Sequence, residues 1–153
     1  MSEQQPIPTI EGQEGASNPE ELAWAFPDVK PGQRPFGGRV TIQLRRIKKT
    51  AGRIIIVDET KENEKWNNMI GKVVAIGPLA FRNRDTMQPW PEGSWAEIGD
   101  FVRVPRWGGD RWERNVPSEK DLDVQEPVLF MTINDHELIS AITDDPLSFK
   151  AYV

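Results

Sequence analysis

Residues 71–78 read GKVVAIGP, and this stretch is the clearest strand signal in the chain. Its β-branched residues predict a strand over 72–76, which the following Gly-Pro pair ends. Upstream, every second residue from Val40 to Leu44 is apolar, which is typical of a half-buried strand. The body of the chain is therefore expected to begin near Arg39 with a strand.

The remaining strand signals lie downstream, and each is bounded by turn-forming residues. They cover residues 101–104, a ragged stretch at 111–116 that follows the turn 107–110, the strongly β stretch 128–133, and a short stretch at 138–142. Residues 79–98 are an excursion rich in turn formers and aromatics. No helical period appears in this body, so several short strands with Gly-rich turns predict an all-β fold, a small β-barrel.

The first 35 residues have a different composition from the body. Gln, Glu, Gly, Pro and Ser dominate residues 1–17, and such a segment cannot bury enough apolar surface to fold alone. Residues 17–21 read SNPEE, which supplies a capping residue and first-turn acids for a short helix that the next proline ends. Its apolar residues Leu22, Trp24 and Phe26 are expected to dock on the protein's own barrel, on a neighbouring copy or on a foreign partner.

Composition excludes several classes of function. The net charge of −5 argues against a general nucleic-acid binder, and the lack of cysteine rules out a disulfide, a thiolate metal site or a thiol nucleophile. The run Asp135-His136-Glu137 contains the single histidine and is interpreted as a solvated turn, so no catalytic or metal site and no cofactor is expected. No apolar run is long enough to span a membrane, so a cytoplasmic protein or one packaged in a particle is expected.

Residues 50–57 read TAGRIIIV and form the most apolar run on a polar segment that spans residues 45–69. A basic run at 45–49 precedes it and an acidic run at 58–64 follows it. An apolar run in such a context is typical of a binding peptide presented to a partner. The basic run either steers this loop toward an acidic partner or is a solvated strand end.

The order of these elements resembles the GroES-type co-chaperonins, the small partners of the ring chaperonins. Residues 39–42 look like the family's opening strand, and 50–56 are similar to its mobile loop, whose usual form is Ser/Thr-Ala-Gly-Gly followed by three aliphatics. Residues 71–78 resemble its Gly-x-Val-x-Ala-x-Gly strand, and residues 99–102 resemble its Gly-Asp-x-Val strand. Residues 128–131 and 134–137 correspond to its last hairpin, and residues 138–142 correspond to its closing strand. The resemblance covers residues 36–143, between an arm (1–35) and a tail (144–153).

The resemblance implies a GroES-like, partly open β-barrel with a long mobile loop and a roof hairpin at residues 79–98. Trp90 and Trp95 would line the central cavity or pack the hairpin. The chaperonin-binding residues would be Gly52, Arg53, Ile54, Ile55, Ile56 and Val57. Family members form heptameric rings by pairing the first and last strands of neighbours, which here implies an interface of Val40, Ile42, Leu44, Leu138, Ile139 and Ile142. The chain would not be an enzyme, because the partner chaperonin uses the ATP.

Several features depart from the family pattern. Arg53 replaces the second glycine of the loop motif, residues 107–125 are longer than the usual turn, and the arm and tail have no counterpart. These features are typical of a phage-encoded or specialised member, with viral capsid protein as a candidate client. The alternative is a virion structural or decoration protein that reuses the barrel. A barrel that stacks nucleic acid or sugar on tryptophans such as Trp107 and Trp112 is disfavoured by the acidic charge.

Overall fold

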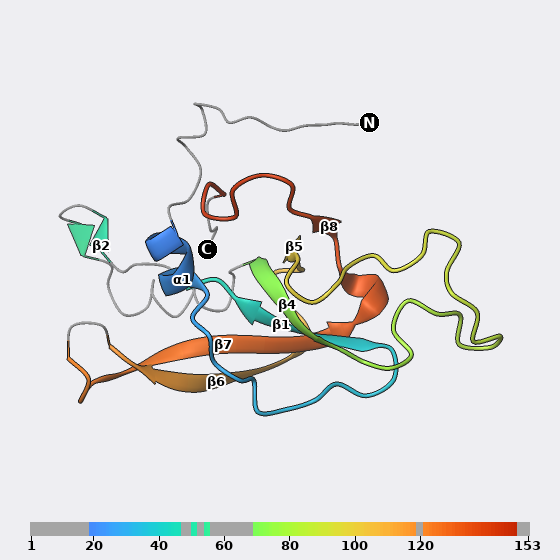
Figure 1. Cartoon of the computed structure of the whole chain (residues 1–153), viewed down its shortest axis with the longest axis horizontal. Helices are drawn as coiled ribbons and strands as arrows, with labels where there is room; N and C mark the ends of the chain where they lie inside the picture. Colours follow the sequence, from blue (N-terminus) through green and yellow to red (C-terminus); the bar gives the residue numbers. More distant parts are fainter. Residues whose placement is uncertain (1–18, 47–49, 52–53, 56–68, 119–120, 150–153) are drawn as a thin grey trace.

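The computed structural model describes residues 19–46, 50–51, 54–55, 69–118 and 121–149, and it confirms the all-β class (Figure 1). Only short helices accompany the strands. The elements are α1 (Pro19–Ala25), β1 (Arg39–Leu44), β2 (Thr50–Ala51), β3 (Ile54–Ile55), β4 (Ile70–Ile76), β5 (Phe101–Arg103), β6 (Asp110–Pro117), β7 (Gln125–Asn134), the 3₁₀ turn η2 (Asp135–Glu137) and β8 (Ser140–Ala141).

Six of the strands form one antiparallel sheet in the order β6-β7-β1-β4-β5-β8. This sheet is open, because β6 and β8 are its two edges and do not pair with each other. Strand β1 lies inside it: Val40 is opposite Ile133 of β7 on one side and Ile76 of β4 on the other. Strand β1 is therefore not free to pair with a neighbouring copy in the way that the family resemblance implied.

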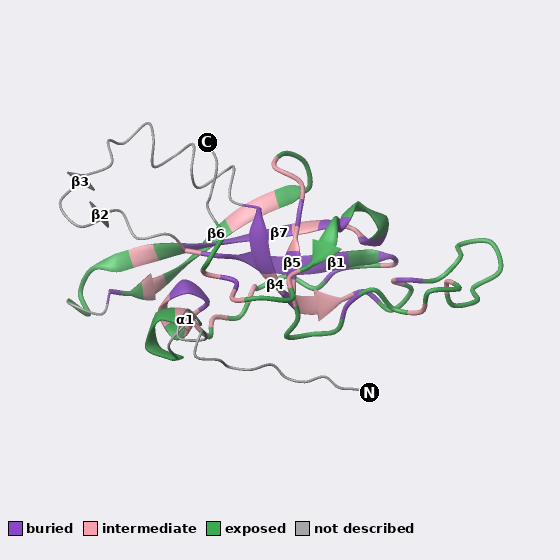
Figure 2. Ribbon diagram, turned by 90° about the horizontal axis from the view of Figure 1, so that it is seen from above, coloured by how far each residue is buried: buried purple, intermediate pink, exposed green. Residues whose placement is uncertain are grey.

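Strand β1 is buried on both faces, whereas the alternation of its residues predicted a half-buried strand. Val40, Ile42 and Leu44 belong to the main core, and Thr41 and Gln43, which alternate with them, are also buried. Figure 2 shows the central strands of the sheet largely in the colour of buried residues. The Thr41 hydroxyl lies 2.9 Å from that of Thr132 on β7, and Gln43 Nε2 donates to the Pro27 carbonyl at 2.8 Å. Polar side chains can be buried here because each has a hydrogen-bond partner.

The arm covers the face of β1 that carries Thr41 and Gln43. The predicted short helix is present as α1, and its residues pack on the protein's own sheet, one of the docking modes expected from the sequence. The cluster consists of Ala25, Phe26 and Ile70, with Leu22, Trp24, Phe101, Ile142 and Leu147 packed against it. Further along the arm, the Trp112 indole of β6 donates to the Pro31 carbonyl at 2.7 Å and stacks on Phe130.

The excursion at residues 79–98 is held by aromatic packing rather than by strands. Trp90 and Trp95 lie with ring centroids 4.7 Å apart, and Trp90 meets Phe81 at 5.5 Å. A single antiparallel bridge joins Arg82 to Pro89. Of the two roles considered for these tryptophans, the contacts favour packing of the excursion.

The C-terminal half contains a long hairpin where the sequence predicted a ragged strand and a polar insertion. Strands β6 and β7 pair continuously from Asp110 opposite Thr132 to Pro117 opposite Gln125. The turn before β6 is tight: a Cβ on Gly109, where φ is 72°, would lie 2.5 Å from Ile133 Cγ2. The last strand, β8, is shorter than the predicted 138–142.

Candidate binding segment and loop root

The described part of the apolar run does not belong to the six-stranded sheet. Ile54 and Ile55 form β3, which among the described residues pairs with β2 alone, with Thr50 opposite Ile55 and Ala51 opposite Ile54. Figure 1 shows β2 away from the main sheet. The other predicted chaperonin-binding residues, Gly52, Arg53, Ile56 and Val57, lie outside the described residues.

The chain leaves the sheet and rejoins it at neighbouring points. Arg45 N donates to the Ile70 carbonyl at 3.0 Å, one residue beyond the pairing of Leu44 with Gly71. Val104 N donates to the Met69 carbonyl at 2.9 Å and ties the returning strand to β5. We call the group Arg45, Arg46, Met69 and Ile70 the loop root. A fixed root is what a binding segment needs to be presented from a defined position.

Gly71 belongs to this close packing beside the root. A Cβ at this position would lie 2.2 Å from Ile42 Cγ2 and 3.0 Å from the Gln43 carbonyl. The absence of a side chain therefore lets β4 approach β1 closely at the point where the segment returns.

Arg45 is a buried cation that holds the C-terminal part of the chain. Its guanidinium Nη1 donates to the Pro146 carbonyl at 2.8 Å and to the Phe149 carbonyl at 2.6 Å. Burial lowers the pKa of Arg45, and the negative charge of Asp145 partly opposes this effect. The group nevertheless remains charged, because an arginine pKa starts far above neutrality. Arg45 therefore acts as a buried, charged anchor for residues 146–149.

Arg46 holds the arm in the same way on the other side of the root. Its backbone N–H donates to the Ala25 carbonyl at 3.0 Å, and its Nε donates to the Trp24 carbonyl at 2.9 Å. Its guanidinium carbon lies 4.2 Å from the centroid of the Trp24 ring, and Nη1 pairs with Glu126 of β7 at 3.0 Å. Four contacts thus connect this one residue to α1 and β7.

These contacts correct the interpretation of the basic run at 45–49. Neither of the two alternatives, steering of a partner or a solvated strand end, fits Arg45 and Arg46, because both use their guanidinium groups inside the fold. Lys48 and Lys49 lie outside the described residues. The sequence carried no local signal for this role, since the acceptors are carbonyls about 20 and 100 residues away in the chain.

The residues expected at a subunit interface have different positions in the structure. Val40, Ile42 and Leu44 are in the core of the single chain, so they are not available to a neighbour. The others come from the last strand region: Leu138 is buried, Ile142 packs beside α1, and Ile139 is 56% exposed. Ile139 alone of the six is well exposed.

Ile139 lines a groove along the β8 edge of the sheet. This groove measures about 280 Å³ and is lined by Glu92, Trp95, Val102, Leu138, Ile139, Ser140 and Ala141. Trp95 is 39% exposed, so an aromatic and an aliphatic side chain are both accessible there. The sequence pointed to this edge through the 138–142 stretch but not to the contribution of Trp95.

The turn after β7 is only partly solvated, contrary to the interpretation from the sequence. The Asp135 side chain is buried and accepts hydrogen bonds from Phe81 N at 2.8 Å and from His136 N at 2.7 Å. His136 and Glu137 are exposed. Asp135 therefore fixes the start of the aromatic excursion to the end of β7. In the part of the chain that the structure describes, no three His, Asp or Glu side chains gather as metal ligands.

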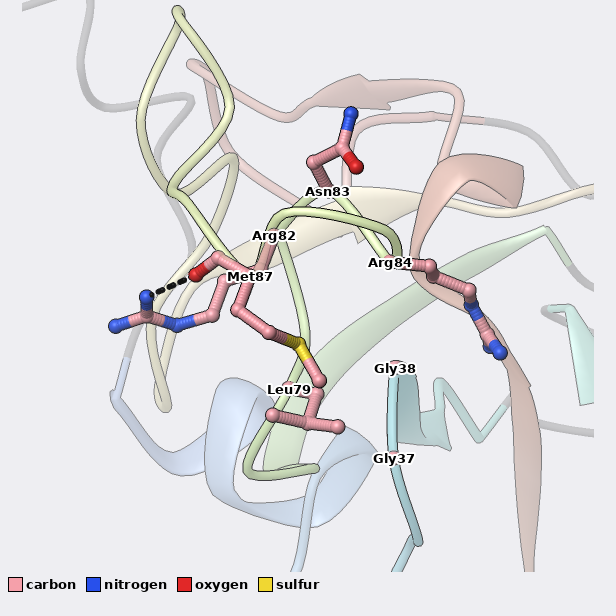
Figure 3. Close-up of a pocket in the computed structure, with 7 residues that line it drawn as sticks. All are labelled: Gly37, Gly38, Leu79, Arg82, Asn83, Arg84 and Met87. Carbon is pink, nitrogen blue, oxygen red and sulfur yellow. Dashed lines mark hydrogen bonds between the residues drawn. The ribbon is translucent and has the colours of Figure 1, made fainter.

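A second hollow lies between the excursion and the start of β1 (Figure 3). It measures about 130 Å³ and is lined by Gly37, Gly38, Leu79, Arg82, Asn83, Arg84 and Met87. Arg82 Nη1 donates to the Met87 carbonyl at 2.8 Å. Figure 3 shows the Arg82 and Arg84 guanidinium groups on opposite sides of the hollow, so they do not converge on one anion.

Comparison with protein-family models and with curated proteins gave no match for this chain. Within the described ranges, no helix is long and apolar enough to cross a membrane.

Proposed function

We propose that the chain is a GroES-type co-chaperonin, not itself an enzyme, that caps a ring chaperonin through the segment at residues 50–57. The observation that carries the proposal is the placement of the apolar run. Ile54 and Ile55 are outside the six-stranded sheet, on a segment that leaves and rejoins that sheet at one root. The family resemblance of the strands at 39–42, 71–78 and 99–102 supports the same function.

The energetics suit a contact that must be reversible. Burying an isoleucine contributes on the order of 1.5–3 kcal/mol, and Ile54, Ile55 and Ile56 supply three. Ordering a segment on binding costs roughly 2–5 kcal/mol, so a single segment binds weakly. In a heptameric ring the tethered segments bind at high effective concentration, and ATP-driven movement of the chaperonin can engage or release them together.

A ring built by this chain would use the β8 edge, and not β1, as one side of its interface. Strand β8 pairs with β5 on one side only, and Ile139 and Trp95 are accessible beside it. An unpaired edge flanked by accessible apolar side chains favours a neighbouring copy as its cover. The excursion at 79–98 would form the roof of such a ring.

A capture experiment with a bacterial ring chaperonin tests the proposal. The purified protein is mixed with the chaperonin with and without ATP, and ATP-dependent capture is expected. Ile55→Asp should abolish capture, because it places a charge in the apolar contact. Ile98→Asp is the matched control, since Ile98 is 67% exposed on the excursion. Equal capture of Ile55→Asp and wild type would refute the assignment of the segment.

A virion structural protein is the second candidate, and the tip of the β6–β7 hairpin favours it. Leu122 is 74% exposed and Val124 is 49% exposed at this tip, which offers an apolar contact for a particle. Mass spectrometry of purified particles separates the two functions. A stoichiometric amount in the particle supports the virion protein, whereas a folding factor with a capsid client would be absent or present in traces.

A further inference from the structure

Two segments that are far apart in the sequence meet at the loop root. Helix α1 reaches it through Trp24 and Ala25, whose carbonyls accept from Arg46. Residues 146–149 reach it through the carbonyls of Pro146 and Phe149, which accept from Arg45. The two consecutive arginines thus hold the arm on one side and the C-terminal segment on the other.

The contacts at the root are directional and mostly charge-assisted. A guanidinium offers donors in a fixed planar arrangement, so it can hold two acceptors only in one orientation. The Arg46 side chain is 11% exposed, with the Trp24 ring against its face and Glu126 at its end. Such an arrangement restricts the backbone of Arg46, which is the last described residue before the segment departs.

The free energy that holds α1 against the sheet is expected to be small. The helix has seven residues, and a helix of this length is marginal in water without tertiary contacts. Its docking relies on a small cluster with Ala25, Phe26 and Ile70 at the centre. Local openings of such a unit cost less than global unfolding. We therefore expect the opening of α1 to require less free energy than unfolding of the six-stranded sheet.

We propose that α1 and residues 146–149 form a clamp on the loop root, and that release of α1 weakens partner binding. A segment whose ends are already fixed loses less conformational entropy when it binds a partner. A fixed root therefore favours binding by the segment. Arg46 is then a positioning residue for the segment at 50–57. The link to partner binding rests on the co-chaperonin function proposed above, whereas the clamp itself does not.

The clamp is tested first without any partner, by amide hydrogen exchange of the full chain. Trp24→Ala removes the ring that faces Arg46, and exchange of the Arg45 and Arg46 amides should rise about tenfold. Trp112→Phe is the matched control, because it removes the indole bond to Pro31, which involves no residue of the root, and retains an aromatic ring beside Phe130. Amides of the β6–β7 hairpin should not change in Trp24→Ala.

The second measurement is the affinity for a ring chaperonin with ATP. Trp24→Ala should bind several-fold more weakly than wild type. Arg46→Lys keeps the charge near Glu126 but cannot bind Glu126 and the Trp24 carbonyl at the same time. The affinity of this variant for the chaperonin should therefore lie between those of wild type and Trp24→Ala.

The clamp would be overturned if the exchange rates of the Arg45 and Arg46 amides were unchanged in Trp24→Ala, or if they rose equally in Trp112→Phe. If these rates rise in Trp24→Ala but its affinity for the chaperonin is unchanged, the role of the clamp in binding would be overturned. If wild type is not captured by any chaperonin, the proposed function fails, and the exchange rates alone decide whether the clamp exists.

Discussion

Replacing Ile42 by alanine tests whether β1 is the centre of the single-chain core or part of a subunit interface. The sequence placed Ile42 at an interface, whereas the structure buries it completely between β4 and β7. A core position predicts a loss of stability that does not depend on protein concentration. An interface position predicts a loss of association, with a folded subunit left behind.

The expected magnitude follows from the packing around the side chain. Truncation of a buried isoleucine to alanine costs about 2–5 kcal/mol, and the cost rises when the surroundings cannot collapse into the cavity. The Gly71 backbone packs directly on Ile42, and paired strands on both sides limit relaxation. We therefore expect a loss of about 3–4 kcal/mol, which corresponds to a fall in Tm of about 6–16 °C in a chain of this size.

The assay is urea unfolding followed by tryptophan fluorescence, repeated over a tenfold range of protein concentration. Ile98→Ala is the matched control: the same truncation at a 67% exposed position outside the proposed interface should change the free energy of unfolding by less than about 0.5 kcal/mol. If Ile42→Ala unfolds at the wild-type midpoint, or only dissociates on dilution, the central position of β1 is refuted.

Two further predictions concern contacts away from the root. Gly77→Ala should lower the free energy of unfolding by about 1–3 kcal/mol in thermal melts, because a Cβ there would lie 2.3 Å from the Gly37 carbonyl and 2.9 Å from the Arg39 carbonyl. A wild-type Tm would contradict this packing. Asp135→Ala should cost about 1–3 kcal/mol and alter the near-UV circular dichroism of the aromatic excursion, since Phe81 N–H loses its acceptor. Asp135→Asn retains an acceptor oxygen and should keep that spectrum, so identical changes in both variants would show that the hydrogen bond is not the cause.

Local patterns were sufficient to predict most of the strands. The stretches that became β1, β4, β5 and β7 combine β-branched residues with flanking Gly, Pro, Asn or Asp, and both signals are short-range. The capping sequence before Leu22 predicted α1 for the same reason. In each case the information that decides the element lies within a few residues of it.

The burial of these elements could not be predicted in this way. Thr41 and Gln43 are polar, and their alternation with apolar residues indicates one solvated face. The second face is covered by the arm, whose contact with Gln43 comes from Pro27. A single-strand pattern contains no information about a distant segment that crosses its polar face. The resemblance to the co-chaperonins assigned the apolar positions of β1 to a subunit interface, whereas β1 lies inside the sheet.

The two arginines of the loop root show why this limitation also affects the candidate site. A charged residue at a strand end is usually solvated, because burying an unpaired charge is costly. Arg45 and Arg46 avoid this cost through backbone carbonyls at the end of α1 and in residues 146–149, and Arg46 also pairs with Glu126. The same hydrogen bonds that close the fold therefore fix the place from which the segment at 50–57 departs. With the clamp proposed above, changes in the arm or in the C-terminal segment are expected to affect stability and the presentation of this segment together.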